Sequence, residues 1–441
     1  MLSCRTYATD RFLIFMVWLI SPLTNSMVKS LFFVINLQKA ITKMKQIPLS
    51  FQLVIILVWA LPQMSTDIYL PSMPAMASYF HTSISMIQYT IFFYTVGFSL
   101  GALFFGPISD RIGRRPVILW SLVIAAIGSL IAMVATSLDI LFAARFIQGI
   151  ALVGVGSTMR AVTKDVCPDK QEMARFGAVL GIVIPIAAAI APVIGGYIEH
   201  YFYWRISFAF LLVYILIFLV YTIKALPETN NDRLERPLKY MLVDYKEVLT
   251  NGLFFRYNAI TAFALCSMFA YVTISPYILQ VKVGLSPEQF GYTNLIIAAT
   301  LVISSYVNSK MIYHRGIDKM LQLGVRLLGV AGILFLIGGI FNFVNLYTII
   351  IPLIILICGC GFIYPNASAG GLSLFSKSAG TAGAIYACIQ MLGGAAGSGM
   401  ISFMTHYGQP QECLGILIIL QGIVGVIFTR QLLRKNQTFT E

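Results

Sequence analysis

The chain has 441 residues, of which 58% carry apolar side chains and only 11% carry charged ones. Soluble domains contain roughly 25% charged residues, so this composition excludes a soluble globular protein. The formal net charge of +13 would suit a nucleic-acid partner, but the basic residues are distributed in a way that excludes this class, as shown below.

Residues 1–46 do not fit a pattern of membrane spans. Their two apolar runs, 11–23 and 31–37, are too short to cross a bilayer comfortably, and no convincing cleavage site follows the first. Met44 begins a short basic stretch of the kind that precedes a first helix. We expect residues 1–46 to be a dispensable extension, with an additional interfacial helix as the alternative.

Apolar runs of about 20 residues recur along the rest of the chain, and each is long enough to cross a hydrocarbon core of ~30 Å as a helix. Runs of this length exclude barrel strands, so the fold class is a polytopic all-α membrane protein. The twelve predicted spans are 50–70, 86–107, 117–136, 140–162, 175–197, 204–224, 256–279, 289–309, 320–342, 346–368, 379–404 and 411–430.

The basic residues fall on alternate loops. The loops on the opposite side contain only Arg205 and Lys282, an asymmetry that places the basic side and the C-terminus in the cytoplasm and argues against a nucleic-acid-binding face. The basic side receives Arg111, Arg114, Arg115, Lys164, Lys170, Arg175, Arg233, Arg236, Lys239, Lys246, Lys310, Arg315, Lys319, Arg430, Arg434 and Lys435.

The longest polar segment between two spans begins at residue 226 and divides the chain into six spans and six spans. This arrangement is typical of transporters built from two repeated halves. The predicted organisation is an extension at 1–46, six-helix bundles at 47–225 and 256–432, a cytoplasmic linker at 226–255 and a cytoplasmic tail at 433–441.

Cysteines and histidines are scattered without the spacing of a zinc site or a disulfide framework. The sequence also lacks a nucleophile elbow and a phosphate-binding loop. We therefore expect no enzyme activity, no cofactor and no metal, and any transport must be driven by a gradient.

Between the second and third runs lies GPISDRIGRRPV (106–117), with one acid and three arginines. In a chain with six plus six spans, this stretch resembles the loop signature of the major facilitator superfamily, G-x-x-x-D-R-x-G-R-[KR]. A tight turn accounts for the glycine and cytoplasmic retention for the arginines, but neither accounts for the acid. The residues that match are Gly106, Asp110, Arg111, Gly113, Arg114 and Arg115.

Further matches follow in order along the chain. RFIQGI (145–150) and APVIGG (191–196) resemble the fourth-helix and antiporter elements of drug:proton antiporters, with Ala191 where glycine is typical. TDIYLPSMPAM (66–76) and MRAVTKDV (159–166) resemble the bicyclomycin and chloramphenicol resistance branch, with Lys164 in place of an expected arginine. The resemblance covers about residues 48–430.

This resemblance implies a latch and a gate. Asp110 would contact the start of span eleven (378–386), and Arg114 would reach Asp165, so that a charge cluster is broken and remade as the halves switch access. In the fifth span, two prolines and two glycines interrupt the helix and would set the gate between the halves, with ordinary packing as the alternative. The gate residues are Pro185, Pro192, Gly195 and Gly196.

Asp67 and Arg145 are the ionisable residues deepest in predicted spans, where a charge costs at least about 2.5 to 3.5 kcal/mol unless it is paired or hydrated. Gln63 shares a helix face with Asp67, and Gln148 shares one with Arg145. Burial favours the neutral form of Asp67, as a reversible proton site requires, and Arg145 would oppose this. We expect this pair to couple protons; capping and packing roles are the alternatives.

A cavity that binds amphiphilic drugs needs aromatic and methionine side chains with few polar anchors. Besides Gln63 and Gln148, the candidates are Tyr89, Phe93, Tyr94, Met268, Tyr271, Tyr277, Tyr364 and Asn366.

The sequence thus predicts a monomeric, multi-pass protein of the bacterial inner membrane whose partners are protons, a small-molecule substrate and the lipid bilayer. Its predicted function is proton-coupled export of amphiphilic drugs or toxic metabolites by alternating access. The alternatives are an importer or uniporter of one metabolite and a membrane receptor that does not transport.

Overall fold

The computed structural model describes residues 49–167, 170–230, 245–375 and 379–437. The predicted extension at 1–46 lies outside these residues. In the described ranges twelve helices are long and apolar enough to span a membrane, which confirms the polytopic all-α fold class. The elements are α3 (Leu49–Asp67), η2 (Leu70–Ser72), α4 (Met73–Tyr79), α5 (Ile84–Ile112), α6 (Arg114–Val134), α7 (Leu138–Val166), α8 (Lys170–Tyr201), α9 (Arg205–Ala225), α11 (Gly252–Pro276), the π-helical η3 (Tyr277–Lys282), α12 (Pro287–Arg315), α13 (Ile317–Ile340), α14 (Leu346–Leu372), η4 (Ser373–Phe375), α15 (Ala379–Met404) and α16 (Pro410–Gln437).

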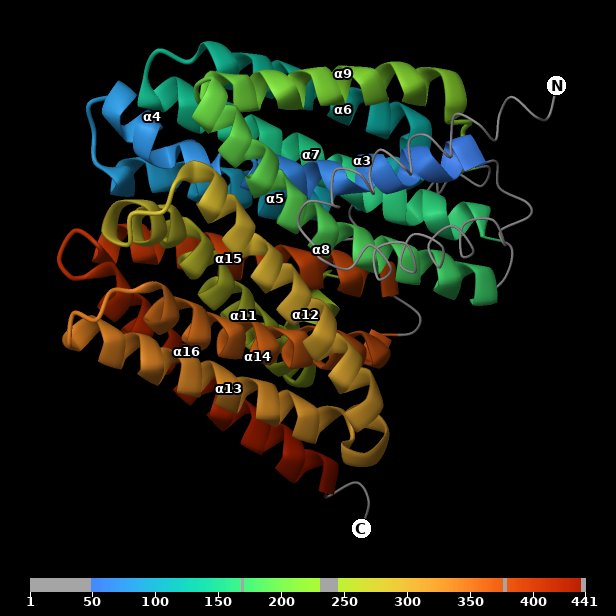
Figure 1. The fold of residues 1–441 in the computed structure, drawn as a ribbon. Helices are drawn as coiled ribbons and strands as arrows, with labels where there is room; N and C mark the ends of the chain where they lie inside the picture. Colours follow the sequence, from blue (N-terminus) through green and yellow to red (C-terminus); the bar gives the residue numbers. More distant parts are fainter. Residues whose placement is uncertain (1–48, 168–169, 231–244, 376–378, 438–441) are drawn as a thin grey trace, which may run out of the picture.

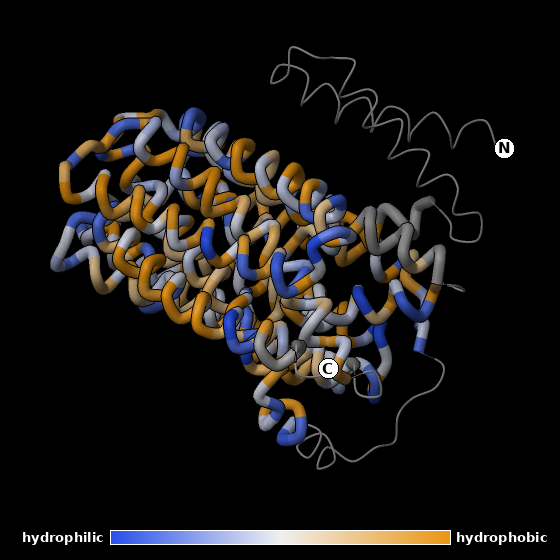
Figure 2. Tube along the Cα trace, turned by 90° about the horizontal axis from the view of Figure 1, so that it is seen from below, coloured by the Kyte–Doolittle hydropathy of each residue, from blue (hydrophilic) through white to orange (hydrophobic). Residues whose placement is uncertain are grey.

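The helices form two groups in Figure 1, α3 to α9 (the first half) and α11 to α16 (the second half), and those of the second half diverge from the first toward the side where α3 begins and α16 ends. We call that side the basic end, because it carries the arginine-rich turn between α5 and α6, and the other side the opposite end. Figure 2 shows hydrophilic residues concentrated toward both ends and hydrophobic ones along the helices between them. This distribution fits a bilayer around the middle of the helices.

Helix boundaries follow from local capping chemistry. At the opposite end, Ser83 accepts the backbone N–H of Met86 at the start of α5, and Ser286 forms a capping box with Gln289 at the start of α12. At the basic end, Gly113 and Gly316 connect α5 to α6 and α12 to α13 with φ of 107° and 76°. Such φ values favour glycine, and the same turn therefore occurs at matching places in the two halves.

The two halves contact each other most extensively in two helix pairs, α8 with α12 and α5 with α15. In the first pair the backbones approach closely at glycines: a Cβ on Gly196 would lie 2.9 Å from Cα of Glu288, and one on Gly291 would lie 2.8 Å from Cα of Val193. In the second pair, Ser99 Oγ donates to the Cys388 carbonyl over 2.8 Å. Backbone contact of this kind needs small residues at the helix interface.

Polar contacts also cross between the halves at the opposite end. His200 Nδ1 pairs with the carboxylate of Glu288, and the hydroxyls of Tyr197 and Tyr292 are hydrogen-bonded. The opposite end is therefore the closed side of this conformation.

The two glycines of the predicted gate have different environments. A Cβ on Gly195 would meet the backbone of Ile68, which lies on the turn just before η2 in the first half. Gly196 instead faces α12 of the second half. Pro185 and Pro192 lie inside α8, which continues through both to Tyr201. Contact across the halves in this region thus depends on Gly196 and Gly291, and Gly195 fixes α8 to the first span.

We predict that Gly196→Ala keeps the opposite end from closing, because the added methyl group would displace the backbone of α12. The variant, the parent and the control all carry Ser85→Cys, at this end, in a cysteine-free background. A thiol reagent that does not cross membranes should then label this cysteine faster in the Gly196→Ala protein than in the protein with Gly196. Gly329→Ala is the control, since a Cβ there has open space among the described residues. Equal labelling of all three proteins would contradict the prediction.

Candidate functional site

A buried arginine organises the polar interior of the first half. Arg145 on α7 is 0% exposed, and its guanidinium carbon lies 4.6 Å from the ring centre of Tyr69 and 4.4 Å from that of Tyr94. Its Nη1 donates to Ser65 Oγ over 3.2 Å and to Gln148 Oε1 over 2.6 Å. Together with Asp67, these residues are called the Arg145 cluster.

The rings take the place that an acid would have in an ion pair. Cation–π contacts in a desolvated site contribute about 2 kcal/mol each, which offsets part of the cost of a charge inside the membrane. Nε and Nη2 of Arg145 have no hydrogen-bond partner among the described residues. The guanidinium therefore keeps two donor nitrogens available for water or a substrate.

Asp67 lies at the end of α3 and is 6% exposed. It accepts a hydrogen bond from Gln63 Nε2 over 2.6 Å, as expected for residues four apart on one helix face. No nitrogen of Arg145 lies within the 4.0 Å that defines an ion pair with its carboxylate. Asp67 is thus a buried carboxylate held by a neutral amide, close to an arginine and free of a direct ion pair.

Gln148 extends the cluster to a fourth helix. Its Nε2 donates to Ser129 Oγ on α6 over 2.8 Å, and Tyr94 OH donates to the Pro62 carbonyl on α3 over 2.8 Å. Side chains from α3, α5, α6 and α7 are thereby connected around one charge. Movement of any of these helices would change the surroundings of Arg145.

The cavity candidates occupy different environments. Phe93 stacks on Phe142 within the first half, and Tyr89 lies beside Phe92. In the second half, Tyr364 OH contacts Met268 Sδ at 3.5 Å.

Three other cavity candidates from the second half make different contacts. Tyr271 packs against Phe335 of α13, and Asn366 donates to Asn308 of α12 over 2.7 Å, so both are buried in helix packing within their own half. Tyr277 lies at the opposite end beside Lys282. A helix pattern gives the spacing of such residues but not which neighbour the helix turns them toward.

The arginine-rich turn forms a second charged site at the basic end. Arg114 Nε donates to Asp165 Oδ2 over 3.0 Å, and its Nη1 contacts Ser109 and the carboxylate of Asp110. The contact between Asp110 and the start of span eleven, implied by the family resemblance, is not among the hydrogen bonds and ion pairs of the described residues. Ser378 itself lies outside them.

Glu228 completes this second site, although no pattern in the sequence predicts its role there. Its carboxylate accepts the backbone N–H groups of Arg114 over 2.8 Å and of Arg115 over 3.2 Å at the start of α6, and also those of Thr229 and Asn230. A Cβ on Gly113 would lie 2.9 Å from the carboxyl carbon of Glu228. Glycine is therefore needed here both for its φ and for the space that the carboxylate occupies.

Burial acts to raise the pKa of Glu228, but its four backbone hydrogen bonds together outweigh burial and hold the pKa below its ordinary value of 4.5. Because the pKa is lower in the folded protein, the ionised carboxylate stabilises the fold at pH values above the ordinary pKa. This stabilisation is lost as the pH falls through the lowered pKa of the folded protein. The only sequence signal was the acid in LPET (226–229), at the exit of the sixth span.

The fold and its charged sites define a multi-pass membrane transporter with two helical halves. A model of the major facilitator superfamily matches residues 55–398, and the chain belongs to this superfamily of transporters. The matched range includes the arginine-rich turn between α5 and α6.

Three relatives resemble the chain over most of its length. Multidrug resistance protein D of Escherichia coli is 27% identical, covering 85% of this chain and 93% of the relative. The bicyclomycin resistance protein homolog of Haemophilus influenzae is 26% identical, with 78% and 86% covered. The chloramphenicol resistance protein of Pseudomonas aeruginosa is 26% identical, with 82% and 87% covered. These relatives match the drug:proton antiporter branch that the sequence resembles.

Among solved structures, a crystal structure of a peptide transporter in complex with alafosfalin superposes with a TM-score of 0.70 at 12% identity. It covers 89% of this chain and 98% of that chain. At this identity the likeness extends to the fold alone.

We predict that Glu228→Gln destabilises the protein by about 1 kcal/mol, the usual contribution of a helix cap, because the neutral amide has one acceptor oxygen instead of two. The midpoint of thermal unfolding should drop at neutral pH, and the difference from the parent should narrow as the pH falls below 4.5. Glu247→Gln, at an exposed acid near the same end, should leave the midpoint unchanged. A difference that persists in acid would argue against the capping role.

We also predict that Arg145→Lys lowers transport about tenfold with normal membrane abundance, since an ammonium keeps the charge but loses the planar stacking on two rings. Arg326→Lys, at an exposed position on α13, is the matched control. Transport at the parental rate in Arg145→Lys would show that only the charge matters.

Proposed function

We propose that the protein exports small amphiphilic drugs or toxic metabolites across the bacterial inner membrane by exchange with protons. The observation that carries this proposal is Asp67, a buried carboxylate without a direct ion pair, next to the Arg145 guanidinium with its two unpartnered nitrogens. Such a carboxylate can bind and release a proton as its hydration changes. The names of the relatives, which refer to multidrug, bicyclomycin and chloramphenicol resistance, support drugs as the substrate class.

The proposed cycle follows from the two ends of the molecule. With the opposite end closed by α8 and α12, substrate enters from the basic end, which we place in the cytoplasm together with the C-terminus. Protonation of Asp67 would remove the charge that faces Arg145. The Arg145 cluster would then rearrange, and because it connects four helices of the first half, the change would reach the contact with the second half.

The basic-end site would act within the first half, whereas the family resemblance implies a latch between the halves. Arg114 binds Asp110 and Asp165, and Glu228 holds the first turn of α6. These contacts connect α5, α6 and α7 with the segment that leaves α9. They would hold the first half as one body while it moves against the second.

The test uses Asp67→Asn, which imitates the protonated form. In proteoliposomes with an imposed proton gradient and chloramphenicol as the substrate, this variant should lose uphill export and still allow downhill exchange. Asp139→Asn, at an exposed acid in the same half, should export normally. Uphill export by Asp67→Asn at the parental rate would exclude Asp67 as the proton site. Uptake in place of export would favour an importer.

A further inference from the structure

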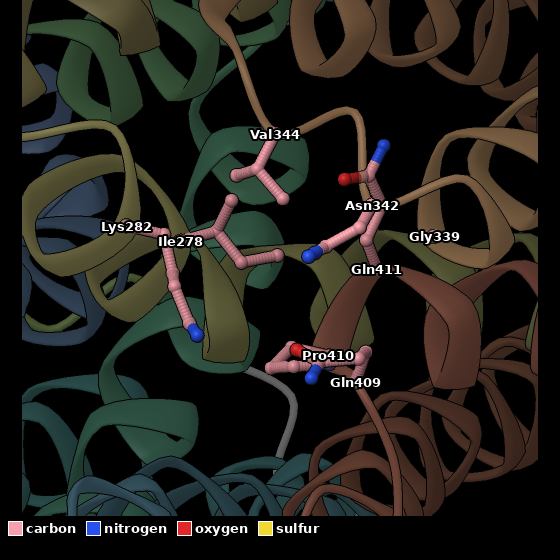
Figure 3. Close-up of a pocket in the computed structure, with 8 residues that line it drawn as sticks. All are labelled: Ile278, Lys282, Gly339, Asn342, Val344, Gln409, Pro410 and Gln411. Atoms are coloured by element: carbon pink, nitrogen blue, oxygen red, sulfur yellow. The ribbon is translucent and has the colours of Figure 1, made fainter.

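Two adjoining hollows lie at the opposite end, the larger one between the halves and the smaller one within the second half, and none of their lining residues belongs to the Arg145 cluster. The larger has a volume of about 380 Å³ and is lined by the first turns of α5 from one half and by Lys282 and Thr405 from the other. The smaller shares Lys282 with it and continues to Gln411 on α16. Figure 3 shows Lys282 and Ile278 on one side of this second hollow, facing Gln409 to Gln411 on the other.

The larger hollow has a positive electrostatic character. Lys282 is exposed, with its ammonium 5.8 Å from the ring centre of Tyr277, and the residues that line the two hollows include no acid. The N-terminus of α5, a helix of 29 residues, opens into the same space. Its first backbone N–H groups and the positive end of its dipole favour a negative group.

A second, independent feature of the hollow is an amide without a partner. Gln88, one turn further along α5, lines the hollow and is only 2% exposed, yet its Oε1 has no hydrogen-bond partner among the described residues. The same holds for Gln411 in the smaller hollow, which is 3% exposed. Buried amides normally have partners, so these two point to a polar ligand or to water.

We propose that this space is a binding site for a small molecule that carries a phosphate group. Lys282 and the start of α5 would bind the phosphate, and Gln88 would hydrogen-bond the rest of the molecule. The volume lies in the range of sites for small organic molecules. Both a soluble phosphate ester and a phospholipid headgroup have this chemistry, and the experiment below separates them.

The position of the site gives its consequence. Its walls come from both halves, at the end where α8 and α12 are in contact, so a bound ligand would stabilise the closed opposite end. This consequence rests on the proposed function, in which the opposite end must open to release drug. A phosphate compound on that side would therefore slow export without entering the drug site.

Binding is tested first, in nanodiscs of phosphatidylcholine. Glycerol 3-phosphate should raise the midpoint of thermal unfolding of the full chain, since a ligand that binds only the folded protein stabilises it. Lys282→Gln should abolish the rise. Lys310→Gln is the matched control, because Lys310 lies 5.8 Å from the ring centre of Tyr306 in the same way, toward the basic end.

The source of the ligand is decided by a second lipid composition. If phosphatidylglycerol in the nanodisc raises the midpoint through Lys282 and glycerol 3-phosphate does not, the natural ligand is a lipid headgroup. If glycerol 3-phosphate raises the midpoint through Lys282, the natural ligand is a soluble phosphate ester. If neither compound distinguishes the parent from Lys282→Gln, the proposal is overturned.

The consequence is tested by export from proteoliposomes. Glycerol 3-phosphate at ten times its dissociation constant, on the side of the opposite end, should slow export about tenfold if it binds only the closed form. Export by Lys282→Gln should be insensitive to it. Equal export rates of the parent with and without glycerol 3-phosphate would overturn the inference that the ligand stabilises the closed opposite end. The binding measurement needs no transport, so failure of the proposed export function would not affect it.

Discussion

A guanidinium without an acid partner inside the membrane is the constraint on which the first half depends. Arg145 is stabilised by two aromatic rings and by two neutral oxygens, which come from α3, the turn that follows it, α5 and α7. Each of these partners must stay in place, because removing one leaves a buried charge less well solvated. The helices that carry them are therefore held in one arrangement, and Asp67 at the end of α3 is positioned by the same requirement.

The contact between the halves has the opposite character. It depends on close backbone approach at Gly196 and Gly291, with an ion pair and a tyrosine pair near the surface. The His200–Glu288 contact is an ion pair only when the imidazole is protonated, and the His200 side chain is half exposed, so the contact adds little to the energy needed to separate the helices. Small residues make the helices fit without interlocking large side chains. Such a contact can close well and still open at modest cost.

The sequence predicted the parts that local physics decides. The spans follow from hydrophobic length, and the turn at Gly113 follows from the need for a positive φ, which the structure shows as 107°. The contact between Arg114 and Asp165 came from the family resemblance and is present at 3.0 Å. The boundaries of the two halves stay a prediction, because much of the linker, 231–244, lies outside the described residues.

Features that depend on tertiary packing were not predicted. Glu228 lies 114 positions from Arg114, and no periodicity brings its carboxylate to the start of α6. Tyr271 was a cavity candidate from its residue type alone, whereas the rotation of α11 in its bundle turns it toward Phe335. The rings around Arg145 were also missed as cation–π partners, since the sequence gives neither the tilt nor the depth at which α3 and α5 cross α7.

The two halves differ in how they satisfy buried polar groups. In the described part of the second half, the buried contacts of Asn366 with Asn308, Thr261 with Tyr386 and Ser267 with Gln421 join neutral groups, and a carboxylate takes part where Tyr257 OH donates to Asp318 at the basic end. Neutral pairs do not change with protonation near neutral pH, whereas the Arg145 cluster contains a full charge and a carboxylate. A proton can therefore change the energy of the first half much more than that of the second. In an exchange cycle, the first half would change its conformation when it binds or releases the proton. The second half would be the surface against which the first half moves as the transporter opens to one side and then to the other.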